Sequence, residues 1–221
     1  MSKVKIISVA LAVAGALSTS AYADGFSPLE VRVGAVWVNT AGGSDAIPAL
    51  GLPSDKIVVQ SKVIPELDIS YFFTKNIAAE VVLTYPQHMN VAINAGSVGH
   101  IGYVDALPPD FMAQYHFLPD GRFDPYVGAG LNFTWLTNVQ LKTGSSPAAA
   151  AVVQSLSLNT SKTSVGPALQ LGMDYKIDKN WVANVDFKYE WMGFDLTSGG
   201  TKVSTLHVDP TLLRVAVGYK F

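Results

Sequence analysis

The chain closes with Leu213-Arg214-Val215-Ala216-Val217-Gly218-Tyr219-Lys220-Phe221, in which large apolar side chains alternate with small or charged ones. Successive side chains of a β-strand point to opposite faces. One face of this segment is therefore apolar from Leu213 to Phe221, and the other carries two basic residues with an alanine and a glycine between them. The alternation predicts a strand that separates an apolar medium from a narrow polar space.

Seven earlier segments alternate with the same period, and in most of them the odd-numbered positions are apolar. The clearest runs from Trp181 to Trp191 and has aromatic residues at both ends. A membrane-spanning strand needs about ten residues between two aromatic girdles, which this segment supplies. The eight segments are 29–38, 66–73, 77–85, 111–117, 126–136, 165–177, 181–191 and 213–221.

The connections between these segments alternate between short and long. The short ones are 74–76, 118–122 and 178–180, and the long ones are roughly 39–57, 86–104, 138–160 and 192–204. We therefore predict an all-β fold, an eight-stranded antiparallel transmembrane β-barrel with short periplasmic turns and long extracellular loops. A helix over 148–156, capped by Ser146, is expected in the third long loop. A secreted β-sandwich is the alternative, because its strands alternate too.

The first residues predict export. Lys3 and Lys5 precede an apolar stretch from Ile6 to Leu17, and Ala21-Tyr22-Ala23 resembles a cleavage site. We assign residues 1–23 to a signal peptide and 24–221 to one barrel domain in the Gram-negative outer membrane. The terminal Phe221 resembles the signal that barrel assembly machinery recognises, so that machinery is an expected partner, together with outer-membrane lipid and lipopolysaccharide.

Composition excludes several functions. Without the leader the chain has 13 Lys and Arg, because Lys3 and Lys5 are removed from 15, against 17 Asp and Glu, so no nucleic-acid partner is expected. There are no cysteines, and the four histidines are scattered. No phosphate-binding loop, H-E-x-x-H or G-x-S-x-G spacing occurs, so we expect no enzyme activity, no metal and no cofactor.

The polar face of the strands predicts a plugged lumen, because eight strands leave an interior just wide enough for side chains. Buried charges persist only when they are paired, so we expect mutual salt bridges among them. The predicted plug residues are Arg32, Glu80, His116, Asp174, Lys176, Asp186, Arg214 and Lys220.

Inward positions nearest the external end are more apolar and predict a vestibule for a hydrophobic solute. They are Val36, Val38, Val82, Met112, Leu136 and Leu212, and the alternative is that they only fill the lumen. Glu66, Lys188 and Glu190 also lie in the outer half and count against a wholly apolar cup. Pro86 and Pro167 lie near outer strand ends, where a missing N–H marks either a lateral opening or a plain strand end.

Two stretches carry a resemblance to a known family. Leu107-Pro108-Pro109, continuing through Gln114-Tyr115-His116-Phe117, and the later Pro125-Tyr126-Val127-Gly128-Ala129-Gly130-Leu131-Asn132 resemble the OmpW/AlkL family of small outer-membrane proteins. The likeness extends to Tyr219-Lys220-Phe221, but Ser164-Val165-Gly166 stands where the family often has Ser-Trp-Gly. The resemblance implies that small hydrophobic molecules enter an outer vestibule and leave sideways into the bilayer.

A structural or adhesive barrel acting through its long loops is the alternative function. A lipid-modifying enzyme would need a serine and a histidine at one rim, and no such spacing is present.

Overall fold

The computed structural model describes residues 27–40, 43–46, 53–94, 99–140 and 158–221. The expected signal peptide and the expected helix at 148–156 lie outside these residues. Within the described ranges every regular element is a β-strand. The same ranges contain no helix that is long and apolar enough to cross a membrane.

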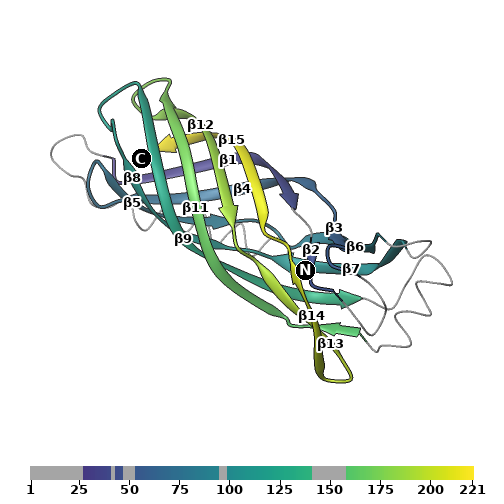
Figure 1. The fold of residues 1–221 in the computed structure, drawn as a ribbon. Coiled ribbons are helices and arrows are strands. Elements are labelled where there is room, and N and C mark those ends of the chain that lie inside the picture. Colours follow the sequence, from purple (N-terminus) through teal and green to yellow (C-terminus); the bar gives the residue numbers. More distant parts are fainter. Residues whose placement is uncertain (1–26, 41–42, 47–52, 95–98, 141–157) are drawn as a thin grey trace.

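Eight long strands form a closed antiparallel barrel (Figure 1). In order around the barrel they are β1 (Leu29–Thr40), β4 (Lys62–Phe72), β5 (Ile77–Leu83), β8 (Asp110–His116), β9 (Phe123–Gln140), β11 (Thr163–Lys176), β12 (Trp181–Glu190) and β15 (Pro210–Lys220). Closure comes from the pairing of the first strand with the last, which runs from Glu30↔Lys220 to Thr40↔Pro210. The predicted eight-stranded antiparallel barrel is confirmed.

The barrel is apolar outside and polar inside. Val33, Val215 and Phe187 expose 61%, 58% and 44% of their surface, whereas Arg32 and Asp186 on the same strands are buried. A sandwich would bury the first three against a second sheet, so that alternative is wrong. A barrel in lipid presents this outer face to hydrocarbon chains.

Exposed aromatic side chains ring the barrel at two levels. At the outer strand ends they are Trp37, Tyr85, Trp135 and Trp191. At the periplasmic ends they are Phe73, Phe117, Phe123, Trp181 and Phe221. Such belts lie at the two membrane–water interfaces of outer-membrane barrels, so they mark the lipid-covered band.

The long links were predicted to be loops. In the structure they contain shorter strands that extend the barrel. These are β2 (Gly43–Ser44), β3 (Ile57–Val59), β6 (Gln87–Ile93), β7 (Gly99–Leu107), β10 (Leu158–Thr160), β13 (Gly193–Ser198) and β14 (Thr201–His207). One group pairs onto β9 in the order β9-β7-β6-β3, and the other forms a separate sheet in the order β10-β13-β14-β2. The extension lies at the end of the barrel opposite the C-terminus (Figure 1).

The extension reverses the facing of its apolar residues. Along the outer half of β12 the inward side chains are Asp186, Lys188 and Glu190, but beyond it the inward side chains are Met192, Phe194 and Leu196, all buried. The outward positions change in the opposite sense, from Phe187 to Asp195. Below this point the outer medium is lipid and above it water, so the change marks the edge of the bilayer.

A side-chain hydrogen bond holds the bend where β12 passes into β13 and β14 into β15. The Met192 N–H donates to Asp209 Oδ1 at 2.8 Å, and the Val208 N–H donates to the Met192 carbonyl at 2.8 Å. Asp209 has φ 31°, a left-handed conformation that Asp and Asn tolerate better than most residues. The bend thus depends on one carboxylate.

We expect Asp209→Ala to lower the free energy of unfolding by about 1.5 kcal/mol, since it leaves the Met192 N–H unpaired and strains residue 209. Urea unfolding in lipid vesicles measures the change. Asp209→Asn keeps both the acceptor and the tolerance for positive φ, so it is expected to stay close to wild type. Equal losses in the two variants would contradict this role.

Candidate functional site

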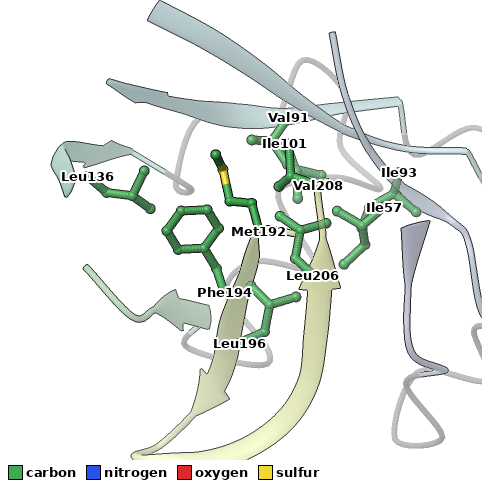
Figure 2. Packing of buried hydrophobic residues seen from close by; sticks show 10 residues of the cluster. All are labelled: Ile57, Val91, Ile93, Ile101, Leu136, Met192, Phe194, Leu196, Leu206 and Val208. Atoms are coloured by element: carbon green, nitrogen blue, oxygen red, sulfur yellow. The ribbon is translucent and has the colours of Figure 1, made fainter. Parts of the chain in front are cut away.

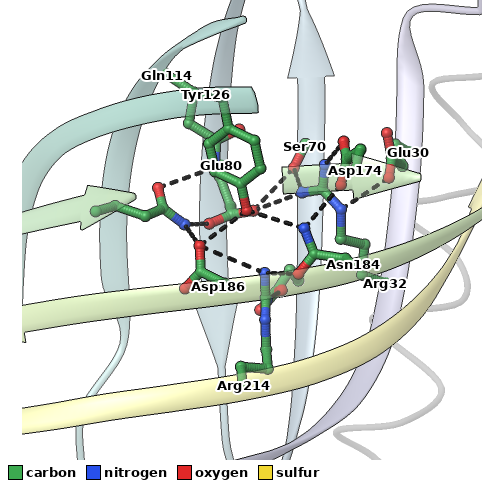
Figure 3. A network of polar contacts seen from close by, with 12 residues as sticks. Glu30, Arg32, Ser70, Glu80, Gln114, Tyr126, Asp174, Asn184, Asp186 and Arg214 are labelled. Carbon is green, nitrogen blue, oxygen red and sulfur yellow. Dashed lines mark hydrogen bonds and ion pairs between the residues drawn. The ribbon is translucent and has the colours of Figure 1, made fainter. Parts of the chain in front are cut away.

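The polar lumen is organised around Arg32, whose side chain is fully buried (Figure 3). Its guanidinium lies 2.7 Å from Glu30, 2.9 Å from Glu80 and 2.8 Å from Asp174, and donates to Ser70 Oγ at 3.0 Å. These partners come from β1, β5, β11 and β4. A single cation therefore ties together opposite walls of the barrel.

Arg214 and Lys188 form a second positive centre nearer the external end. Arg214 pairs with Asp68 and with Glu66 at 3.2 Å, and it donates to Asn184 Oδ1 at 2.9 Å. Lys188 lies 3.1 Å from the same Glu66 oxygen and 3.7 Å from Asp186. The carboxylate of Glu66 is thus shared between two buried cations.

Neutral side chains join the two centres into one network. Gln170 Nε2 donates to Glu80 at 2.9 Å and to Asp186 at 2.8 Å, and Tyr126 Oη donates to Asp186 at 2.8 Å. Figure 3 shows the contact between Tyr126 and Asp186 crossing the lumen between strands. Close packing fills the remaining space, since a Cβ added at Gly172 would lie 2.2 Å from the Tyr126 ring. The barrel therefore contains a plug of side chains at this level.

The structure places the eight predicted plug residues at three depths. Arg32, Glu80, Asp174, Asp186 and Arg214 belong to the central network. His116 is buried below it, with its Nδ1 3.0 Å from Asp124 and its ring stacked on Tyr126. Lys176 and Lys220 lie at the periplasmic rim and are only partly buried; Lys176 donates to the Pro119 carbonyl, and Lys220 lies 3.3 Å from Glu30.

Several members of the network were missed from sequence. They are Glu30, Ser70, Gln114, Tyr126, Gln170 and Asn184. Each occupies an even-numbered, inward position, so the period-two pattern was a sufficient signal. Neutral side chains on the inward face were not predicted as plug residues, and neither was Glu30 at the start of the first strand.

In the part of the chain that the structure describes, one group of histidine and carboxylate side chains is close enough to bind a metal ion. His116, Asp124 and Asp174 offer ligand atoms within 4.8 Å of one another. Most of these atoms already have protein partners, because His116 Nδ1 bonds to Asp124 while Asp174 accepts from Arg32 and Asn184; His116 Nε2 is buried without a partner. We therefore assign them to the plug.

An apolar cavity of about 100 Å³ lies above the plug, in the external extension. Ten buried hydrophobic residues pack together here, and all of them except Ile93 line the cavity (Figure 2). They are Ile57, Val91, Ile93, Ile101, Leu136, Met192, Phe194, Leu196, Leu206 and Val208. They come mainly from β3, β6, β7, β13 and β14, so the extension supplies most of this apolar cluster, while the long barrel strands complete the wall with residues such as Val38, Ile64 and Leu212.

Three of the six predicted vestibule residues reach this cavity, namely Val38, Leu136 and Leu212. The other three, Val36, Val82 and Met112, are buried inside the barrel and are not among the residues that line it. Most of the remaining apolar wall residues were missed because their segments were expected to be loops. The reversed apolar parity at Phe194 and Leu196, and again at Leu206 and Val208, was the signal that identifies them.

The wall of the barrel has a gap in its ladder beside Pro86. Pairing of β5 with β8 ends at Val82↔Asp110, and the next pairing on this side is that of β6 with β7 at Gln87↔Ala106. Between these two ladders, among the described residues, no residue of 83–86 pairs with a residue of 107–109. We call this interval the β5–β8 seam. Thr84 and Pro108 in the seam, and Asp110 next to it, also line the cavity.

Pro167 occupies a different environment. It pairs with Leu131 in a β9–β11 register that runs without a break from Thr163 to Tyr175. On its other side the Pro167 carbonyl accepts from the Trp191 N–H at 3.0 Å. The structure therefore places Pro86 in an interval where β5 and β8 no longer pair, whereas Pro167 is paired with β9 on one side and its carbonyl is bonded on the other.

A closed antiparallel barrel with a lipid-facing apolar surface, two aromatic belts and a plugged lumen defines a small outer-membrane β-barrel protein. The chain belongs to the OmpW family, whose sequence profile matches residues 28–221. It is 37% identical to the uncharacterized outer-membrane protein y4mB of Sinorhizobium fredii over 212 residues. This aligned region covers 92% of this chain and 84% of that protein. Outer membrane protein W of Escherichia coli is 32% identical over 98% of this chain and 99% of its own length.

Similarity to AlkL and to solved structures agrees with this assignment. Outer membrane protein AlkL of Ectopseudomonas oleovorans is 28% identical over 83% of this chain and 74% of its own length. The crystal structure of OprG from Pseudomonas aeruginosa superposes with a TM-score of 0.74 at 24% identity, covering 88% of this chain and 96% of that one. The latter shows a common fold, and the relatives' names place the family in the outer membrane.

Proposed function

We propose that this protein takes up small hydrophobic molecules across the outer membrane, receiving them in the apolar cavity and releasing them sideways into the bilayer. The observation that carries the proposal is the position of the cavity directly above a closed polar plug. An apolar wall binds a hydrophobic solute, whereas the buried charges below it oppose passage straight through. The family likeness to AlkL is consistent with such a role.

Lateral release at the β5–β8 seam completes the proposed path. The seam adjoins the cavity through Thr84 and Pro108, and its outer side lies beside the exposed Tyr85 of the outer aromatic belt. Proline lacks the N–H that a ladder needs, and prolines stand at 86, 108 and 109. A solute at the inner end of the cavity is therefore separated from lipid by an unpaired stretch of wall.

The proposal is tested by uptake of a radiolabelled alkane into cells that carry wild-type protein or Leu206→Asp. Leu206 is buried against the cavity, and a carboxylate there makes the wall unfavourable for an alkane. We expect the protein-dependent uptake rate to fall about tenfold, equivalent to about 1.4 kcal/mol.

Thr205→Asp is the matched control, since Thr205 is the neighbouring residue on β14, lies on the opposite face and does not line the cavity. It is expected to leave uptake unchanged. Both variants are first checked for heat-modifiable migration of the folded barrel in gels. Unchanged uptake in a folded Leu206→Asp protein would contradict the proposal and favour a barrel that acts through its external loops.

A further inference from the structure

Polar side chains that contact one another lie at the inner end of the cavity, where the barrel strands leave the plug. Asp110 and Glu190 line the cavity there, and their carboxyl groups lie side by side. Asn132 Nδ2 donates to Asp110 Oδ1 at 2.6 Å, and Thr134 Oγ1 donates to Asn132 Oδ1 at 2.7 Å. The carboxyl pair is therefore fixed in place at the bottom of an otherwise apolar space.

The buried cations near this floor are held by other partners. Lys188 is bonded to Glu66, and Arg214 is bonded to Glu66, Asp68 and Asn184. Neither cation lines the cavity, whereas Glu66 does. The side of the floor that faces the cavity is consequently rich in acceptor oxygens.

Two further polar atoms at this level have no partner. Gln87 is 3% exposed, and while its Nε2 donates to the Tyr85 carbonyl at 2.7 Å, its Oε1 is buried and unbonded. Thr84 Oγ1 is likewise buried without a partner. Both residues line the cavity beside the seam. An unpaired buried acceptor is unfavourable, and a donor brought by a ligand removes that cost.

We propose that the preferred solute is amphipathic, an apolar chain that ends in a hydroxyl group, with the hydroxyl held at the floor by Gln87 Oε1 and the Asp110–Glu190 pair. The chain then lies among the apolar walls formed by Phe194, Leu206 and their neighbours. This inference rests on the proposed function, because it names the class of solute for the same cavity. A hydroxyl suits the floor because it donates a hydrogen bond without bringing a charge into an apolar space. A carboxylate head is disfavoured by the carboxyl groups already present.

The test uses the methionine methyl groups of the whole protein in lipid nanodiscs, labelled with ¹³C and followed by NMR. Met89 and Met192 line the cavity, and Met173 faces outward from β11, so its signal reports solute dissolved in the bilayer. The probes are 1-decanol, methyl nonyl ether, decane and decanoate, each titrated as a mole fraction of the lipid. The ether matches decanol in size but lacks the donor.

We expect 1-decanol to give saturable shifts at Met89 and Met192 with an affinity about tenfold above those of the ether and of decane, a difference of about 1.4 kcal/mol. Decanoate is expected to bind most weakly. Gln87→Leu is expected to reduce the preference for decanol over the ether to below about threefold, because the acceptor is lost. Gln60→Leu, an exposed position that does not line the cavity, is the control and keeps the preference.

The outcomes separate the two proposals. Equal affinities for decanol, ether and decane at Met192 overturn the inference about the hydroxyl and leave the apolar cavity as a general site for hydrophobic solutes. Tighter binding of decanoate also overturns it. Shifts confined to Met173 for every probe show that solute reaches only the lipid, and they overturn the proposed function itself.

Discussion

Replacement of Arg32 by methionine is expected to lower the free energy of unfolding in lipid vesicles by about 3–5 kcal/mol. The variant removes the cation but leaves Glu30, Glu80 and Asp174 buried around an uncharged side chain. Uncompensated carboxylates in a water-poor interior carry most of this loss, because methionine fills much of the vacated volume. Guanidinium or urea unfolding followed by tryptophan fluorescence measures it.

An exposed ion pair provides the matched comparison. Lys202 lies 2.6 Å from Asp195 in the extension, with about half of each side chain exposed to solvent. Lys202→Met is expected to change the unfolding free energy by less than about 1 kcal/mol, because exposed pairs are screened by water and salt. If Arg32→Met and Lys202→Met cost the same, the central network contributes no more than a surface contact.

The facing of the barrel strands was predictable because two solvents act on one strand. Lipid requires an apolar side chain at every second position, as at Val33 and Val215, and the narrow lumen requires a small or paired polar one, as at Arg32. The alternation therefore specifies the face of each residue without any knowledge of its neighbours. Strand number and direction followed from the regular alternation of short and long links.

The partners of the plug residues were not predictable in the same way. Arg32 bonds to Asp174, 142 positions away, and Arg214 bonds to Glu66, 148 positions away. Such contacts depend on how far each strand is staggered relative to the next around the ring, and the period of one strand does not contain that stagger. The same stagger sets how deep in the barrel each residue lies. Val82 and Met112 were therefore predicted at the vestibule, whereas they lie within the barrel and do not line the cavity.

The extension was missed because its strands are short and their apolar residues face inward. The pattern at Phe194 and Leu196 has the same period as the membrane strands but the opposite parity. A search for apolar odd-numbered positions treats such a segment as the end of the strand. The opposite parity indicates a wall that is surrounded by water and encloses an apolar space, which is the cavity on which the proposed function depends.

Arginine substitutions along the outer face are expected to locate the edge of the lipid. Val185→Arg, in the middle of the exposed band, is expected to destabilise the folded barrel in vesicles by about 2–4 kcal/mol relative to Val185→Ala. Thr197→Arg, on the same face but in the extension, is expected to stay within about 0.5 kcal/mol of Thr197→Ala. The alanine variant at each position removes the contribution of lost packing from the comparison.

The same arginine measurement at Phe111 tests lateral release, because Phe111 faces outward directly below the β5–β8 seam. Phe111→Arg is expected to cost about 1–2 kcal/mol relative to Phe111→Ala, between the other two sites, because the cost of a lipid-facing arginine declines towards the interface. An intermediate cost means that hydrocarbon reaches the seam, so a solute that leaves the cavity there enters lipid directly. A cost as small as that at Thr197 would mean that the seam opens into water, and a hydrophobic solute would then gain nothing by leaving through it.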